Sequence, residues 1–171
     1  GELLALWEDP RLCPHFHVPL QSGSDSVLRR MRRRYDTSQY AEAVERIRST
    51  VPGVAITADL IVGFPGETEE DFMKTFDFIS DLHVSYLHVF TYSERPNTAA
   101  AMADKVPMQE RRRRNEILRR LSEKKKTAFY SNHVEEMRKV LFEESKNVRG
   151  AGGLGWMGAA AVRSRSETHH R

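Results

Sequence analysis

The sequence predicts an α/β fold with parallel strands, because three apolar segments each run into a turn-forming loop and then a helical pattern. These segments are HFHVPLQSGSD (15–25), ITADLIVGFPGETEED (56–71) and LHVFTYSERPNT (87–98). A repeated strand, loop and helix builds parallel sheet, and such folds place their ligands at the carboxyl ends of the strands. We therefore expect the functional site near Gln21, Gly63 and Tyr92.

The composition is that of a globular domain, with 171 residues of which 39% are hydrophobic and 30% charged. No apolar run approaches the roughly 18 residues of a bilayer crossing, and no basic-then-apolar signal opens the chain. Cys13 is the single cysteine, which rules out an internal disulfide. These features predict a cytoplasmic protein without a membrane partner, and leave its oligomeric state open.

The first segment begins after residues 1–14, which read as the end of a helix and a turn. Residues 15–20 alternate as a strand, with Phe16 and Leu20 on one side and the histidines on the other. Ser24 or Asp25 then caps a short helix. A second helix starts at Thr37 and ends at Pro52 and Gly53.

The second segment is a β-branched strand over residues 54–62, as expected where both faces are covered. In the turn at residues 63–67, glycines allow close backbone approach, and the next helix offers free N–H groups to a carboxylate or phosphate. A plain strand-to-helix turn explains the same residues. Thr68 and Asp71 form a capping box at the start of that helix.

The third segment is a strand over residues 86–92, followed from Pro107 by a long amphipathic helix into the 130s. From residue 146 the sequence loses all periodicity and becomes rich in Gly, Ala, Arg and Ser, so we predict a disordered or unrelated tail. His169 and His170 lie in this tail. The predicted fold is thus a partial (β/α) barrel fragment, a long helix and a disordered tail.

Placed side by side, the strands present one apolar face to the helices and one polar face to a lumen. The buried carboxylate of Asp59 on that face indicates either a structural network or a ligand site. A rival reading uses His15 and His17, with His88 and Asp59, as ligands of a metal-dependent (β/α)-barrel hydrolase. The polar set consists of His15, His17, Gln21, Thr57, Asp59, His88, Phe90 and Tyr92.

Two basic clusters, at residues 29–34 and 105–126, predict attraction to a polyanion such as RNA. A solvated helix face explains the second cluster equally well. Helical spacing also spreads residues 111–114 around the axis, so they cannot all face one ligand. The candidate RNA-binding residues are Arg32, Arg33, Arg34, Arg112 and Arg113.

Taken together, three stretches resemble the second half of the radical S-adenosylmethionine (SAM) domain of methylthiotransferases. They are HFHVPLQSGSDSVLRRMRRRYDT, DLIVGFPGETEEDF and LHVFTYSERPNTAAAM, within residues 11–144. The His-x-His-x-Pro-Leu-Gln-Ser-Gly-Ser-Asp and Leu-His-Val-Phe forms most resemble the enzymes that methylthiolate threonylcarbamoyladenosine beside the tRNA anticodon. The resemblance implies a tRNA substrate and a (β/α) barrel with two 4Fe-4S clusters, one of which cleaves SAM to a 5′-deoxyadenosyl radical.

The resemblance also implies cofactor contacts. Gln21 and Ser22 would lie near the ribose or methionine part, and Phe90 with Tyr92 would border the adenine. The strand equivalent to the family's glycine and isoleucine motif supplies Asp59, Ile61 and Gly63. Asp59 replaces the first glycine of that motif, and its acidic residue falls one position late. No catalytic residue is assigned.

The cluster needs three cysteine thiolates, whereas this chain has only Cys13. We therefore expect an inactive fragment that lacks its amino-terminal methylthiotransferase and cluster-binding segments. Residues 1–140 would be the carboxyl-terminal part of the barrel domain, 141–145 the start of a TRAM-like domain, and 146–171 the tail. The alternatives are an RNA-binding module without catalysis and the metal-dependent hydrolase.

Overall fold

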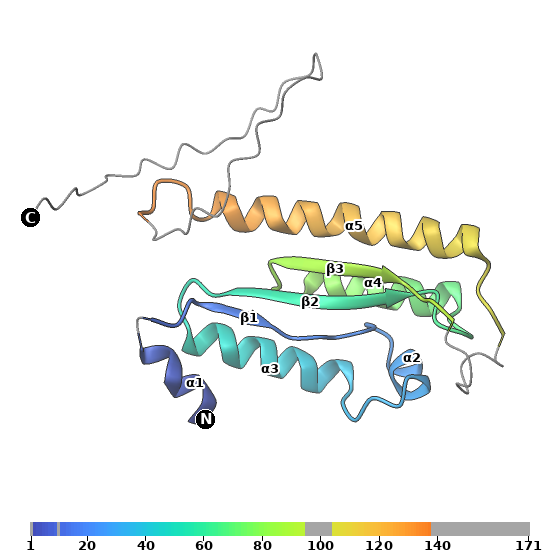
Figure 1. Ribbon diagram of the computed structural model, residues 1–171, viewed down its shortest axis with the longest axis horizontal. Coiled ribbons are helices and arrows are strands. Elements are labelled where there is room, and N and C mark those ends of the chain that lie inside the picture. The colour runs from blue at the N-terminus through green and yellow to red at the C-terminus, as the bar shows by residue number, and fades with distance from the viewer. Residues whose placement is uncertain (1, 10, 95–103, 138–171) are drawn as a thin grey trace, which may run out of the picture. The chain divides into compact units, whose positions relative to one another are not determined.

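The computed structural model describes residues 2–9, 11–94 and 104–137. The chain divides into two compact units, residues 1–129 and 130–171. The elements are α1 (Glu2–Ala5), a 3-10 turn (Leu6–Glu8), β1 (His15–His17), α2 (Asp25–Arg30), α3 (Thr37–Thr50), β2 (Ala55–Val62), α4 (Glu69–Asp81), β3 (Tyr86–Thr91) and α5 (Met108–Ser131) (Figure 1).

The three strands form one parallel sheet in the order β1-β2-β3, which confirms the predicted fold class. The first strand is shorter than predicted. It ends at His17, whereas we expected it to reach residue 20. The Val18 N–H still donates to the Thr57 carbonyl, and regular pairing stops at Pro19. Pairing resumes as an isolated bridge, in which the Gln21 N–H donates to Asp59 and the Gln21 carbonyl accepts from Ile61.

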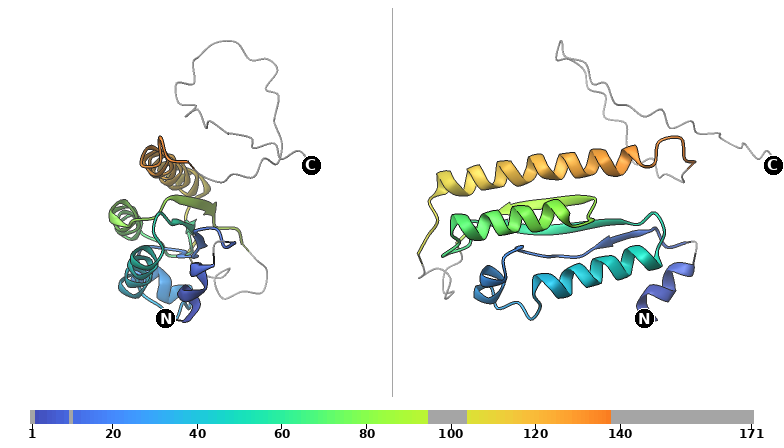
Figure 2. Two further views of the ribbon diagram at one scale, coloured as in Figure 1. Left: turned by 90° about the vertical axis from the view of Figure 1, so that its left-hand side faces the viewer. Right: turned by 180° about the vertical axis from the view of Figure 1, so that it is seen from behind.

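The core lies between the sheet and its helices. On β2, side chains alternate between buried and half-buried positions, so Ile56, Ala58, Leu60 and Val62 face the core. They pack in one cluster with apolar residues of three helices: Tyr40, Val44 and Ile47 of α3, Phe72 and Ile79 of α4, and Leu118 of α5. Figure 2 shows α3 and α4 along the same side of the sheet. The opposite, polar face of β2 stays partly open.

Two helices begin at capping boxes. Thr68 and Asp71 cap α4 as predicted, and Asp36 with Gln39 caps α3. The predicted side-chain cap of α2 is wrong. Ser24 occupies the N-cap position, but its hydroxyl donates to Asp71, and the Asp25 carboxylate accepts from the Thr37 N–H instead.

Some sequence-based expectations fall outside the described residues. These are the TRAM-like start at 141–145, the tail at 146–171 and its two histidines. Among the described residues, no helix combines the length and apolarity needed to span a bilayer.

Candidate functional site

One pocket lies at the carboxyl ends of β2 and β3, next to the residues at the end of α2. Its volume is about 310 Å³, and it is lined by Arg30, Met31, Arg32, Arg33, Ile61, Phe64 and Tyr92. The Phe64 and Tyr92 rings pack edge to face, with their centroids 5.3 Å apart. An aromatic and aliphatic wall with a cationic rim suits a flat base attached to an anionic group.

Gln21, which forms the isolated bridge after β1, has an unusual backbone conformation. It is buried, and its φ of 76° lies in the left-handed region that non-glycine residues avoid. The two backbone hydrogen bonds to β2 hold it there. Such strain persists only where the surrounding structure imposes it, and it concentrates at ligand sites. This observation supports Gln21 as a site residue.

Ser22 is positioned differently from the predicted cofactor contact. Its buried hydroxyl lies 3.2 Å from the Thr75 hydroxyl, which also accepts from the Gly23 N–H. A Cβ at Gly23 would lie 2.8 Å from the Thr75 Cα, so only glycine permits this approach. The Ser22 side chain therefore fastens the loop to α4.

Asp71 of α4 makes a second set of contacts with the same loop and with α2. Its carboxylate accepts from the Ser24 hydroxyl and the Arg30 guanidinium, both at 2.7 Å, and from Ser26. Burial disfavours its ionised form, but the donors Ser26, Ser24 and Arg30 outweigh burial and hold the pKa of Asp71 below its ordinary value. The Ser-Gly-Ser-Asp-Ser stretch thus serves mainly to position Gln21.

The turn after β2 does not offer the free N–H groups that we expected. The Gly63 N–H donates to the Glu67 carboxylate at 2.6 Å, and the Gly66 N–H donates to the Asp104 carbonyl. Thr68 and Asp71 occupy further amides at the start of α4. Groups of the chain itself therefore already accept these four N–H groups, and the anion site at this turn stays a prediction.

A buried ion pair joins this turn to α5. The Arg114 Nη1 lies 2.8 Å from the Glu67 Oε2, and the two side chains are 5% and 1% exposed. Burial raises the pKa of Glu67, although Arg114 and the Gly63 N–H act in the opposite direction. Arg114 also pairs with Glu110 and Glu69. The acid that falls late in the motif is therefore a structural partner of α5.

The α5 arginines divide between the interior and the surface. Arg111 is buried and donates to the Val106 and Tyr92 carbonyls, and Arg114 is held by Glu67. The predicted RNA-binding residues Arg112 and Arg113 are both exposed, and Arg113 makes ion pairs with Glu69 and Glu110. Sequence reasoning missed the internal roles of Arg111 and Arg114. Their shared helical face with Leu118 is the signal that indicates them.

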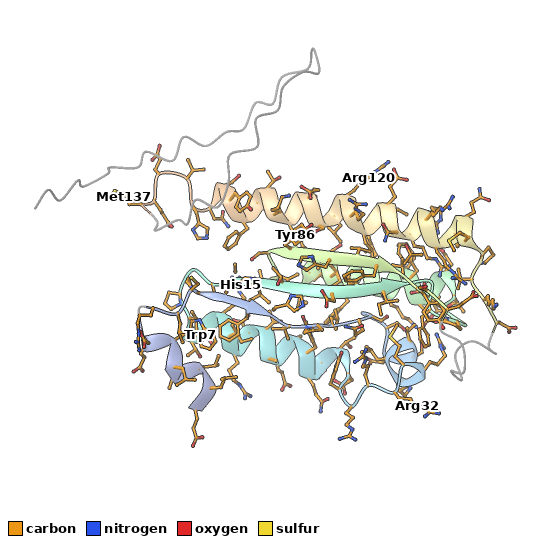
Figure 3. All side chains as sticks on the ribbon, viewed as in Figure 1. Trp7, His15, Arg32, Tyr86, Arg120 and Met137 are labelled. Atoms are coloured by element: carbon orange, nitrogen blue, oxygen red, sulfur yellow. The ribbon has the colours of Figure 1, made fainter. Side chains whose placement is uncertain are left out.

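The residues after α2 keep the predicted exposed character. Arg32, Arg33 and Arg34 are all exposed, and the first two line the pocket. Arg32 has a φ of 56°. In Figure 3, Arg32 lies beside α2, outside the sheet, whereas His15 lies at the start of β1.

The polar face brings three predicted groups together. The His17 Nε2 lies 3.1 Å from the Asp59 Oδ2, and its Nδ1 lies 2.9 Å from the Thr57 hydroxyl. With His88, potential ligand atoms of His17 and Asp59 fall within 4.8 Å of one another. His15 contacts only Thr57 of this set, at 3.3 Å. Hydrogen bonds thus satisfy Asp59 on an open surface.

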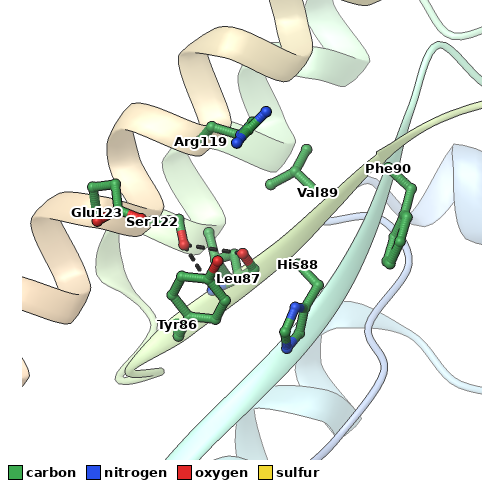
Figure 4. Close-up of a pocket in the computed structure, with 8 residues that line it drawn as sticks. All are labelled: Tyr86, Leu87, His88, Val89, Phe90, Arg119, Ser122 and Glu123. Atoms are coloured by element: carbon green, nitrogen blue, oxygen red, sulfur yellow. Dashed lines mark hydrogen bonds between the residues drawn. The ribbon is translucent and has the colours of Figure 1, made fainter. Parts of the chain in front are cut away.

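Phe90 and Tyr92 line two different pockets of the described residues. Tyr92 lines the site at the carboxyl ends, whereas Phe90, which is 53% exposed, lines a pocket beside α5. Figure 4 shows this second pocket with Phe90 at its edge. That both rings border one adenine stays a prediction.

Both the sequence and the fold of this chain are similar to those of known proteins. The Radical SAM superfamily pattern matches residues 2–79. The fold is also similar to that of coproporphyrinogen III oxidase from Escherichia coli, a radical SAM enzyme, with a TM-score of 0.60 and 21% identity over 72% of this chain and 29% of that one. The sequence pattern thus relates the first half of this chain to radical SAM proteins, and the solved structure shows that the fold is shared.

Curated relatives narrow the assignment. A tRNA-2-methylthio-N(6)-dimethylallyladenosine synthase of Endomicrobium trichonymphae is 42% identical over 81% of this chain and 34% of its own length. A threonylcarbamoyladenosine tRNA methylthiotransferase of Thermotoga maritima is 40% identical over 81% of this chain and 32% of its own length. The predicted relation to the radical SAM methylthiotransferases is confirmed, and the chain spans about a third of these relatives' length.

Proposed function

We propose that this chain is the carboxyl-terminal part, residues 1–140, of the radical SAM domain of a cytoplasmic tRNA methylthiotransferase. The observation that carries the proposal is the pocket at the carboxyl ends of β2 and β3, where Ile61, Phe64 and Tyr92 lie beside the arginines at the end of α2. The similarity to tRNA-modifying relatives supports the same conclusion.

The pocket and the neighbouring residues at the carboxyl ends of the strands would bind the adenosyl and methionyl parts of SAM. Ile61 and Tyr92 offer an apolar wall for a base, and Asp59 offers carboxylate oxygens to ribose hydroxyls. Gln21 would orient the methionyl end, and Gly63 would let the backbone approach. Ser22 would act by fastening the loop. When bound in a complete enzyme, SAM supplies radical chemistry, whereas these residues bind and orient it.

The iron–sulfur cluster does not fit this chain. Cluster binding requires several thiolates, and Cys13 is the single cysteine and is exposed. We therefore propose that the cluster ligands and the methylthiotransferase segment come from elsewhere in a longer parent protein, and that this chain alone is inactive. Coverage of about a third of the relatives supports this division.

We propose that the parent acts on N6-threonylcarbamoyladenosine next to the tRNA anticodon, adding a methylthio group at C2. The His-x-His-x-Pro-Leu-Gln and Leu-His-Val-Phe sequences favour this nucleoside over dimethylallyladenosine. Arg32, Arg33 and Arg34, beside the pocket, and the exposed Arg112 would contact RNA phosphates. Arg113 contributes less, because Glu69 and Glu110 already neutralise it.

A chimera tests the proposal. Residues 11–137 would replace the matching segment of the Thermotoga maritima enzyme, and SAM affinity, SAM cleavage and methylthiolation of both tRNA types would be measured. We expect activity on threonylcarbamoyladenosine and at least tenfold weaker SAM binding in the Gln21→Ala variant, with Gln109→Ala at the exposed start of α5 as control. Unchanged SAM affinity in Gln21→Ala would remove Gln21 from the site.

The grouping of His17, Asp59 and His88 favours one other function, a metal-dependent hydrolase. Stoichiometric zinc that disappears in His17→Ala would support it, and purified protein without zinc would end it. The remaining alternative is a non-catalytic RNA-binding module. It would be indicated if the chain binds RNA while the chimera shows no affinity for SAM.

A further inference from the structure

Three side chains on the open face of the sheet form a group that can hold one metal ion. His17, Asp59 and His88 belong to β1, β2 and β3, so each strand contributes one of them. Each side chain offers one ligand atom, and these three atoms all lie within 4.8 Å of one another. An ion at this place would contact all three strands.

The strand register brings these side chains together. Asp59 is the pairing partner of His88, and His17 pairs with Thr57, which lies two residues before Asp59 on the same side of β2. The ring centroids of His17 and His88 are 5.5 Å apart. In Figure 4, His88 extends from the side of β3 opposite to Val89. The spacing of the three groups is therefore set by backbone pairing within the sheet.

The donor set suits a late divalent transition metal. Two imidazole nitrogens and one carboxylate oxygen are the protein ligands of many zinc and non-haem iron sites, in which water occupies the remaining positions. Around an ion with bonds of about 2.1 Å, tetrahedral ligand atoms lie about 3.4 Å apart. The His17 Nε2 and the Asp59 Oδ2 are already 3.1 Å apart. Small side-chain rotations bring His88 to the same ion.

Thr57 orients His17 for this role. The Thr57 hydroxyl lies 2.9 Å from the His17 Nδ1. A hydroxyl can accept as well as donate, so it can accept the Nδ1 proton and leave the Nε2 lone pair for the ion. Histidine ligands are ordinarily held in this way, by a hydrogen bond through the ring nitrogen that does not bind the metal.

His88 is available as the third ligand. In the part of the chain that the structure describes, its ring makes no hydrogen bond and packs edge to face on the Tyr86 ring, with the centroids 4.9 Å apart. His17 and His88 are exposed and Asp59 is partly buried, so water can complete the coordination of an ion. Only the Oδ2 of Asp59 faces His17, which leaves Oδ1 for the ribose contact proposed above.

We propose that His17, Asp59 and His88 bind one zinc-like divalent ion, which links the three strands on the open face of the sheet. The proposal includes no reaction at the ion and is therefore independent of the hydrolase alternative. It also goes beyond methylthiolation, because the ion would stabilise the sheet of this chain itself. An ion that binds the folded chain and not the unfolded chain raises the unfolding temperature.

Metal titration of the full chain tests the site. His169 and His170 are replaced by alanine in every protein, because these adjacent histidines are also possible ligands. We expect calorimetric titration to show one Zn²⁺ per chain, and Co²⁺ to give the visible absorption of a protein-bound ion. Zn²⁺ should raise the unfolding temperature. Mg²⁺, which prefers sites made of oxygen ligands, should produce neither binding nor a shift.

Two histidine variants locate the ion. We expect His88→Ala to bind Zn²⁺ at least tenfold more weakly than wild type and to lose the thermal shift. His15→Ala is the matched control, because His15 is exposed on the same strand as His17 and lies outside the group of three. Unfolding without metal checks that both variants fold.

Equal Zn²⁺ affinity in His15→Ala and His88→Ala, or no Zn²⁺ binding by wild type, would overturn the proposal. Asp59→Asn gives a further check on the same ion, since an amide oxygen is a weaker ligand than a carboxylate, and unchanged Zn²⁺ affinity in this variant would remove Asp59 from the site. SAM affinity and methylthiolation in the chimera report the proposed function separately.

Discussion

The two faces of the sheet differ in how deeply their side chains are buried. Toward the helices, Leu60 and its neighbours are fully buried, and even the charged groups on that side are paired out of water, as Arg114 is with Glu67. On the other face, Asp59 and His17 keep 24% and 43% of their side chains exposed. Stability therefore resides on the covered side, and the open side is available for chemistry.

Removal of Arg114 should be the largest single loss. Arg114→Met leaves the buried Glu67 carboxylate without its guanidinium partner, and we expect a loss of about 3–5 kcal/mol in the free energy of unfolding. Arg113→Met removes a neighbouring exposed arginine and should cost about 1 kcal/mol or less. Urea denaturation measures both, and equal losses would contradict the structural role of the buried pair.

A cavity on the covered face should cost nearly as much. Leu60→Ala removes a fully buried side chain, with an expected loss of about 2–5 kcal/mol. Ile61→Ala, one residue further and on the half-exposed face, should cost about 1 kcal/mol. If thermal and chemical unfolding show equal losses of stability for Leu60→Ala and Ile61→Ala, the two faces do not differ in their contribution to the free energy of unfolding.

The loop fastened by Asp71 gives a pH-dependent prediction. Because the folded pKa of Asp71 lies below its unfolded value of 3.8, its contribution is complete above about pH 4 and is lost as the pH falls toward the folded pKa. Asp71→Asn should cost about 1–3 kcal/mol at pH 7. That difference from wild type should shrink below pH 4, whereas Asp77→Asn, exposed on the same helix, should follow wild type at every pH.

The open face should tolerate change with the smallest effect on folding. Asp59→Asn weakens a partly exposed contact with His17, so we expect a change within about 1 kcal/mol. In the chimera, the same substitution should lower SAM affinity at least tenfold. Calorimetric titration together with urea denaturation checks both parts, and a large stability loss would place Asp59 in a structural network.

Much of the fold follows from local sequence. The repeated order of strand, loop and helix predicted the parallel sheet, and Thr68 with Asp71 predicted the start of α4, because these signals depend on neighbours along the chain. The early end of β1 at His17 and the bridge at Gln21 were not predicted. That bridge depends on β2, which lies some 40 residues away in the sequence.

By itself, the sequence determined the class of fold, the alternation of covered and open faces, and the position of the site where the strands end. Only the tertiary structure decided how the polar groups are used. It paired Glu67 with Arg114, Ser22 with Thr75, and the Ser122 hydroxyl of α5 with the Leu87 backbone of β3. The reason is physical: a buried polar group must find a partner in space, and its nearest partners come from segments that are remote along the chain.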